Sequence, residues 1–351
     1  MFLLKKSVLL VGGIMVITKT PFRMSFFGGG TDIPDFFSEE RGAVISTTFD
    51  KYAYVTVRHL PRFFEHSTEI KYSKTERVTK LDDIAHPMVR NAMKMMDMHE
   101  LYISYDADLP GRTGLGTSST FAVGLLNSFY CLKGKYASKK QLADDAIKLE
   151  RELCNEAGGW QDQIAASFGG FNRIDFNKDG YQVRPIIISP LRKQQLDENL
   201  MLFFTGFTRF SSEIQQSTKA SIADKKRQLL QMLELVDEAQ EILENKNRDL
   251  NDFGRLLDKT WKLKKQTGSG ISKDSIDEFY DRGISAGALG GKLLGAGGGG
   301  FLLFYVQKDK QDAVRQELKE LMEVPFNFED GGTRVVYYAP EAFDLSSTKE
   351  E

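Results

Sequence analysis

The segment with the strongest local chemical signal reads Pro110-Gly-Arg-Thr-Gly-Leu-Gly-Thr-Ser-Ser119, in a chain of 351 residues. It lies between a strand-like run at 101–105 and an apolar run at 119–132, which is expected to be a buried helix. Glycines allow a backbone to approach a ligand closely, and a helix start presents free N–H groups and the positive end of the helix dipole. The segment therefore predicts an anion-binding loop. The hydroxyls of Thr117, Ser118 and Ser119 suit capping of the helix, coordination of Mg²⁺, or both.

Two further glycine clusters lie on either side of this segment, at Gly28–Gly30 and at Gly295 with Gly297–Gly300. The 31 glycines make up about 9% of the chain against a usual 7% or so, and a single cluster would be read as a tight turn. The last cluster satisfies G-x-G-x-x-G, but a dinucleotide-binding turn follows a strand and opens a helix. Here a predicted helix precedes the cluster and a predicted strand follows it, which excludes that fold. The sequence also lacks the P-loop motif G-x-x-x-x-G-K-[ST].

Three carboxylates accompany the glycine clusters. Asp32 follows the first cluster, and Glu150 lies on a helix that Ser138 is predicted to cap. Asp162 lies in Gly-Gly-Trp-Gln-Asp-Gln at 158–163, an irregular segment between two predicted helices, where functional residues often occur. The four histidines and two cysteines show no metal-ligand spacing and no Cys–His pairing, which argues against a transition-metal site or a cysteine nucleophile.

The composition narrows the class of protein. Lys and Arg number 47 against 49 Asp and Glu, so no basic excess favours nucleic acid. No apolar run reaches 18 residues, which argues against a membrane span, and two cysteines favour a reducing cytoplasm. Residues 1–15 lack a signal-peptide cleavage site and are interpreted as an N-terminal extension. Whether the protein is a monomer or a homodimer is left open.

The pattern of apolar residues predicts a mixed chain of two domains, 16–190 and 191–345, with a flexible tail at 346–351. The boundary is placed where Pro185 and Pro190 bracket a predicted strand. Strands are expected at 16–20, 42–48, 52–58, 101–105, 200–204, 301–306 and 333–338. Helices are expected at 81–98 (with its start broken or offset by Pro87), 119–132, 138–156, 161–168, 217–245, 250–266, 273–289 and 310–322.

Three segments, taken in order, resemble the motifs of the GHMP kinase superfamily of small-molecule kinases. They are Arg23–Asp32, Pro110–Thr120 and Leu294–Gly300. The resemblance covers residues 16–340 and implies an α+β fold with two domains. The N-terminal domain would contain a left-handed βαβ crossover, and the C-terminal domain would be ferredoxin-like. It also implies an ATP-dependent kinase that uses Mg²⁺. Further strings at 26–32, 46–52, 158–163 and 287–300 are similar to those of bacterial D-glycero-D-manno-heptose 7-phosphate kinases, which phosphorylate the anomeric hydroxyl on the route to GDP-heptose and surface glycans.

The resemblance implies roles for individual residues. Asp162 would face the sugar hydroxyl, and Arg23 would stabilise the γ-phosphate or hold Asp162. Ser118 and Glu150 would hold Mg²⁺. ATP would contact Pro110, Gly111, Gly114, Leu115, Gly116, Thr117, Ser118 and Ser119. The sugar would contact Gly29, Gly30, Thr31, Asp32, Gly297 and Gly298.

No motif identifies the group that binds the 7-phosphate. The candidates are Lys51, Arg112, Arg209, Lys264 and Lys292, with Lys262 and Lys265 next. Two other functions stay open: another sugar-1-kinase of the superfamily, such as a fucokinase, and a catalytically silent sugar sensor. Retention of Arg23, Ser118, Glu150 and Asp162 together argues against the sensor.

Overall fold

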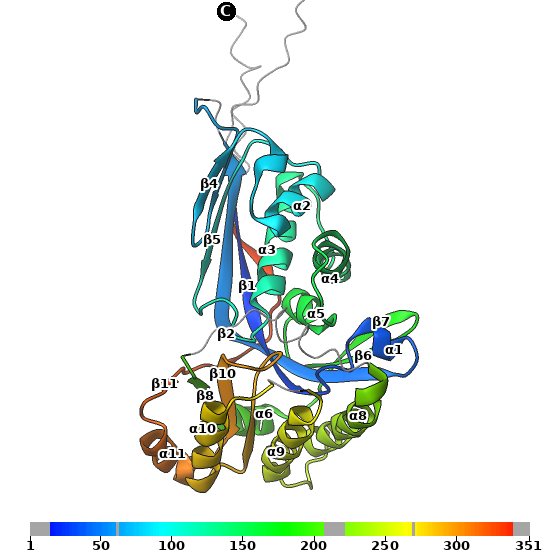
Figure 1. Cartoon of the computed structure of the whole chain (residues 1–351), viewed down its shortest axis with the longest axis vertical. Helices are drawn as coiled ribbons and strands as arrows, with labels where there is room; N and C mark the ends of the chain where they lie inside the picture. The colour runs from blue at the N-terminus through cyan, green and yellow to red at the C-terminus, as the bar shows by residue number, and fades with distance from the viewer. Residues whose placement is uncertain (1–14, 61–62, 207–221, 269–270, 340–351) are drawn as a thin grey trace, which may run out of the picture.

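The computed structural model describes residues 15–60, 63–206, 222–268 and 271–339. Two long strands, β1 (Met15–Phe27) and β2 (Gly42–His59), pair antiparallel along almost their whole length and run down the molecule in Figure 1. The sequence predicts two strands, at 42–48 and 52–58, where the single β2 lies. The structure has one strand, because β2 continues through Asp50 and Lys51, but these two residues form a bulge in its pairing with β1: Pro21 pairs with Tyr52 and Phe22 with Phe49.

The main strand order of the large sheet is β13-β1-β2-β5-β3-β4; in addition, β6 and β12 pair with β2, and β7 pairs with β6. The parallel pair within it is β3 with β5, joined through β4 and α2, which forms the βαβ unit of the expected crossover. Its handedness stays a prediction. The strands have the bounds β3 (Thr68–Lys71), β4 (Thr75–Val78), β5 (Leu101–Ala107), β6 (Asn172–Asn177), β7 (Gly180–Pro185), β12 (Phe328–Glu329) and β13 (Arg334–Ala339).

Helices cover one side of this sheet in Figure 1. The helix α3 (Thr117–Leu132) packs on β1 and β2, and almost all of its side chains are buried, as its apolar sequence predicts. Around it lie α2 (Pro87–Met95), α4 (Lys139–Ile147) and α5 (Gln161–Phe168). Pro87 begins α2, so the predicted helix at 81–98 starts later, after a 3₁₀ turn at Leu81–Asp83. The short helix α1 (Pro34–Phe37) follows the first glycine cluster.

The second sheet is formed by β8 (Leu200–Phe204), β9 (Gly290–Leu293), β10 (Phe301–Tyr305) and β11 (Met322–Glu323). The spatial order is β11-β8-β10-β9, in which the first and third strands along the chain are central and all pairs are antiparallel. This order and the intervening helices agree with the expected ferredoxin-like domain. The helices are α6 (Pro190–Glu198), α8 (Ile222–Glu244), α9 (Asn251–Lys265), α10 (Asp274–Ser285) and α11 (Gln311–Glu317).

One of the hydrophobic clusters is built from both domains. Phe26 and Phe27 of β1 contact Phe253 of α9 edge to face, with ring centroids 5.4 and 5.1 Å apart. The same cluster includes Val236 of α8 and Leu294 beyond β9. The end of β1, which carries the first glycine cluster, is therefore fixed against helices of the second domain.

Several predicted boundaries need correction. No strand lies between Pro185 and Pro190: β7 ends at Pro185 and α6 begins at Pro190. The strands β12 and β13 pair with β2 and β1, so the end of the described chain returns to the first sheet and the C-terminal range 191–345 does not form one separate body. The helices α10 and α11 end earlier than predicted. Residues 1–14, 217–221 and 340–351, which include the expected extension and tail, lie outside the described residues.

Within the part of the chain that the structure describes, no helix combines the length and the apolar character needed to cross a membrane.

Candidate active site

The ion pair between Arg23 and Asp162 lies at the centre of the candidate site. Arg23 on β1 donates from Nε and Nη2 to the two carboxylate oxygens of Asp162, at 2.7 and 2.8 Å, and its Nη1 donates to the carbonyl of Gly114 at 2.7 Å. The arginine side chain is 5% exposed and the aspartate 23% exposed. A bidentate pair fixes the orientation of the carboxylate while leaving part of it accessible. The first and second motifs and α5 therefore meet at one point, as the sequence predicts.

Asp32 joins the first motif to the segment that carries Asp162. Its carboxylate accepts hydrogen bonds from the backbone N–H of Gly30 at 2.9 Å and of Gln161 at 3.3 Å. A Cβ on Gly159 would lie only 1.8 Å from Asp32 Oδ2, so a glycine is needed there. Burial raises the pKa of the Asp32 carboxyl, and the negative charge of Asp162 adds to the shift. Asp32 is 3% exposed, and in this structure it positions two loops.

The other residues predicted to contact the sugar in the first motif differ in their surroundings. Thr31 is fully buried, and its hydroxyl donates to the carbonyls of Gly28 and Ala43 at 2.8 and 2.9 Å. Its side chain therefore stabilises the loop and is not exposed to a substrate. Gly29 and Gly30 are partly exposed beside Gln161 and α8 respectively, where their backbone is open to a ligand.

The second motif forms the expected loop at the start of α3. Gly114 and Gly116 have positive φ values of 81° and 77°, and Gly116 occupies the N-cap position with no side-chain hydrogen bond. The helix is therefore not capped by the hydroxyl of Thr117, Ser118 or Ser119. The first-turn N–H groups stay open for an anion. Leu115 is buried and accepts a backbone hydrogen bond from Arg23, whereas Pro110 and Gly111 are exposed at the outer end of the loop.

The third glycine segment packs directly on this loop. A Cβ on Gly295 would lie 2.2 Å from the Cα of Gly114, and a Cβ on Gly300 would lie 2.1 Å from the carbonyl oxygen of Thr113. Gly295 and Gly300 thus provide the close approach between the motifs. Gly297 and Gly298, which were predicted to contact the sugar, lie instead against the backbone of Ile271, to which the Gly298 N–H donates at 2.8 Å.

Two hydroxyls and two carboxylates lie beside the start of α3. Glu150, on a π-helical turn at Lys148–Leu153, is 1% exposed and accepts hydrogen bonds from Ser119 Oγ at 2.6 Å and from Gln163. Ser118 is exposed and donates to Glu156 at 3.5 Å. The structure therefore pairs Ser119, not Ser118, most directly with Glu150.

The chemistry of these groups fits Mg²⁺. Burial raises the pKa of the Glu150 carboxyl and the charge of Glu156 adds to the shift, while the charge of Arg151 and both serine hydroxyls oppose it. Burial also raises the pKa of Glu156. A divalent cation bound by these hard oxygen ligands would relieve the repulsion between the two carboxylates.

Several buried oxygen atoms at the site have no hydrogen-bond partner in the described structure. They belong to Ser25 (Oγ), Thr117 (Oγ1), Gln161 (Oε1) and Gln163 (Oε1). Ser25 Oγ and Gln161 Nε2 lie equally close to Gly29, because a Cβ there would be 3.8 Å from each. Buried polar groups are usually satisfied, so unpaired oxygens at converging loops indicate positions that a polar ligand would occupy.

Comparison with known proteins decides the family. The description "GHMP kinases N terminal domain" matches residues 83–170, and "GHMP kinases C terminal" matches residues 233–324. The D-glycero-alpha-D-manno-heptose 7-phosphate kinase of Campylobacter jejuni is 30% identical over 332 residues, which is 89% of this chain and 96% of that protein. The chain belongs to the GHMP kinase family. As a GHMP kinase it is an ATP-dependent phosphotransferase, and the family resemblance inferred from the three motifs is confirmed.

Two further relatives of this GHMP kinase are informative. The L-fucokinase/L-fucose-1-P guanylyltransferase of Bacteroides fragilis is 31% identical over 221 residues, which is 60% of this chain and 22% of that protein. The crystal structure of a D-glycero-D-manno-heptose 1-phosphate kinase from Bacteroides thetaiotaomicron superposes with a TM-score of 0.74 at 24% identity, covering 92% of this chain and 99% of that one. This second likeness confirms the two-domain fold.

Sequence reasoning missed several residues of the site. Gln163 lies in the quoted string at 158–163, so its polar side chain beside Asp162 was an available signal. Glu156 had no comparable signal. Its carboxylate lies 3.5 Å from the Ser118 hydroxyl only because the π-helical turn before it ends at Leu153. The close approaches of Gly295 and Gly159 also needed the structure.

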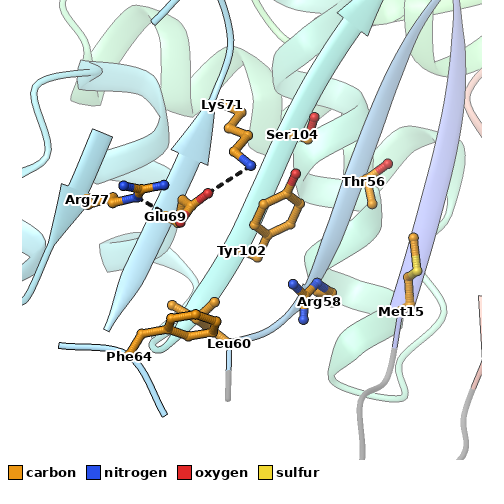
Figure 2. A pocket seen from close by; sticks show the side chains of 10 residues that line it. All are labelled: Met15, Thr56, Arg58, Leu60, Phe64, Glu69, Lys71, Arg77, Tyr102 and Ser104. Atoms are coloured by element: carbon orange, nitrogen blue, oxygen red, sulfur yellow. Dashed lines mark hydrogen bonds and ion pairs between the residues drawn. The ribbon is translucent and has the colours of Figure 1, made fainter. Parts of the chain in front are cut away.

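A hollow of about 540 Å³ lies elsewhere, on the large sheet (Figure 2). Thr56 and Arg58 line it and alternate along β2 with Val55 and Val57, which belong to the core under α3, so the hollow opens on the opposite side of the sheet. Its lining residues are Met15, Thr56, Arg58, Leu60, Phe64, Glu69, Lys71, Arg77, Tyr102 and Ser104. Glu69 pairs there with Lys71 at 2.9 Å and Arg77 at 3.0 Å. None of the predicted site residues lines this hollow.

Proposed function

We propose that this GHMP kinase transfers the γ-phosphoryl group of ATP to the anomeric hydroxyl of D-glycero-D-manno-heptose 7-phosphate and forms the 1,7-bisphosphate. The observation that carries the proposal is the Arg23–Asp162 pair, placed beside the glycine loop before α3. The Campylobacter jejuni relative, whose name states this substrate, supports the choice of sugar at 30% identity over 89% of the chain.

The nucleotide would bind at the start of α3. Backbone N–H groups from Gly114 to Ser119 would hold its phosphates, helped by the helix dipole. Ser118, Glu150 and Glu156 would hold Mg²⁺, with Ser119 keeping Glu150 in place. When bound, Mg²⁺ neutralises charge on the phosphates.

The acceptor would bind on the other side of Asp162, near Gly29. The unpaired oxygens of Ser25 and Gln161 would accept hydrogen bonds from sugar hydroxyls. Asp162 would accept the proton of the anomeric hydroxyl late in the transfer, and Arg23 would keep the carboxylate aimed at it. Phosphoryl transfer depends mainly on positioning and charge neutralisation, which suits a site with few reactive groups.

A substrate panel tests this proposal. Purified full chain with ATP and Mg²⁺ is offered heptose 7-phosphate, the unphosphorylated heptose, L-fucose, galactose and mevalonate. We expect the highest kcat/KM with heptose 7-phosphate. The similarity to a fucokinase over 221 residues supports a second candidate, a fucokinase-like enzyme, and equal or better turnover of fucose would select it. No turnover of any compound would select a sugar sensor.

A further inference from the structure

One lysine of α9 faces the site and lacks a carboxylate partner. Lys264 donates from Nζ to the carbonyl of Gly295, in the third glycine segment. Its neighbours on the helix are paired: Lys262 with Asp258 at 2.7 Å and Lys265 with Asp277 at 2.9 Å. Among the residues that the structure describes, no carboxylate lies within 4.0 Å of Lys264 Nζ.

The surroundings of Lys264 are unusually rich in buried positive charge. Burial lowers the pKa of Lys264 to about 8, and the charge of Arg23 adds to the shift while Asp32 opposes it. Lys292 lies close by, is 2% exposed and donates to the carbonyls of Ser25 and Phe26 at 2.8 Å each. Its pKa is lowered well below the usual value by burial and by the charge of Lys264. Among the described residues, Asp32 is the carboxylate whose charge acts on Lys264, and Asp162 is already paired with Arg23.

The other basic candidates are accounted for differently. Lys292 is held between backbone carbonyls and joins the first motif to β9, so its role is structural. Lys51 pairs with Asp50 at 2.9 Å. Arg112 lies on the exposed outer part of the nucleotide loop, and Arg209 lies outside the described residues. Lys264 is the candidate that faces both the first and the third motif.

Lys264 lies where the two proposed subsites meet, because its partner Gly295 packs on Gly114 of the nucleotide loop. It lies within electrostatic reach of Asp32, whose loop carries Gly29 and Gly30. The hydroxyl and carboxylate groups that fit Mg²⁺ lie instead beside the start of α3, around Ser118 and Glu150. A phosphate at the far end of a sugar whose anomeric hydroxyl meets Asp162 would lie away from those groups.

We infer that Lys264 forms a phosphate subsite for the acceptor, at which the protein binds the phosphate that the sugar already carries. This inference rests on the proposed function and extends it, because it explains selection of a phosphorylated sugar over a free one. An ammonium group that exchanges a backbone carbonyl for a phosphate oxygen gains a charge-assisted hydrogen bond. The dianion also supplies negative charge beside Lys264.

The test compares Lys264→Met with Lys264→Arg and with Lys259→Met, an exposed lysine of the same helix. For Lys264→Met we expect KM for heptose 7-phosphate to rise about tenfold to a hundredfold, the range expected when a hydrogen bond to a charged group is lost. Turnover of the unphosphorylated heptose should stay as in the wild type. Lys264→Arg should restore most of the affinity, and Lys259→Met should behave as the wild type.

Other outcomes are equally decisive. An unchanged KM would overturn the inference, and an equal fall in kcat for both sugars would reassign Lys264 to the γ-phosphate. Calorimetry with heptose 7-phosphate in the absence of ATP separates this inference from the proposed reaction. If the wild type binds the sugar phosphate and Lys264→Met binds it equally well, the subsite is wrong and the proposed reaction is unaffected. If the wild type prefers a different phosphorylated sugar and Lys264→Met loses that preference, the subsite holds and the named substrate is wrong.

Discussion

Two nitrogens of Arg23 orient the carboxylate of Asp162. Because this carboxylate is proposed to act on the acceptor, its role can be tested separately from nucleotide binding. Asp162→Asn should lower kcat about 10²–10⁴-fold, the usual contribution of a general base, because the amide cannot accept the proton. ATP affinity measured by calorimetry should not change. A matched control exists in Asp175→Asn, since Asp175 pairs with Arg173 at 2.8 Å with similar exposure but belongs to β6, outside the site. Loss of ATP binding along with the rate would refute the assignment.

Glu150 is a buried carboxyl with a raised pKa, and this gives its proposed metal role a pH signature. A carboxylate must be deprotonated to bind a metal. As the pH falls through the raised pKa, more of the carboxyl is protonated, and the Mg²⁺ concentration needed for half-maximal activity should rise. This rise should begin at a higher pH than it would if an exposed glutamate bound the metal.

Glu150→Gln should raise that Mg²⁺ requirement at every pH and remove its dependence on this carboxyl. The control is Glu152→Gln, an exposed residue of the same π-helical turn, which should leave the titration unchanged. Identical metal titrations for Glu150→Gln and the wild type would show that Glu150 does not act on the metal.

The loop before α3 depends on glycine for its conformation as well as for space. Gly114→Ala places a Cβ 2.3 Å from the carbonyl oxygen of Leu294 and forces alanine to a φ of 81°. We expect the free energy of unfolding to fall by about 1–2 kcal/mol from the backbone strain alone, and ATP affinity to fall with it because the loop moves. Gly111→Ala is the control, since nothing lies within 4 Å of its Cβ position. Thermal unfolding and ATP calorimetry measure both effects, and equal behaviour of the two variants would contradict this account of the loop.

The sequence predicted this loop well and other elements poorly, for physical reasons. The loop and α3 depend on local features: glycines, then an apolar run with no polar break. The contact of Ser119 with Glu150 depends on which way consecutive hydroxyls point, and this is fixed only once Gly116 is known to be the N-cap. The return of β13 to β1 joins residues more than 300 positions apart, which no local pattern records.

The two domains are predicted to unfold as one unit because they share a core. Phe253 of α9 contacts Phe26 and Phe27 of β1 and is fully buried. Phe253→Ala should lower the free energy of unfolding by about 3–5 kcal/mol and should leave a single transition in calorimetry. Phe63→Ala, at a side chain that is 89% exposed, should have no measurable effect. Two separate transitions in the wild type would show that the domains are independent.

This shared core also explains why the site can be built from both domains. Arg23 of β1, Asp162 of α5 and the loop at Gly114 come from the first domain, and Gly295 of the second domain packs on that loop. Lys292 and Lys264 extend that junction from the second domain toward the first motif. The position of the substrate relative to ATP is therefore set by the packing of the domains, and not by one loop alone.

The most direct measurement is ³¹P NMR of the full chain with ATP, Mg²⁺ and heptose 7-phosphate, run in parallel with Asp162→Asn. The proposal predicts that the wild type forms ADP and a second sugar phosphate resonance coupled to the anomeric proton, and that the variant binds ATP but forms neither. A new phosphate on any other carbon, or equal product from the variant, would contradict it.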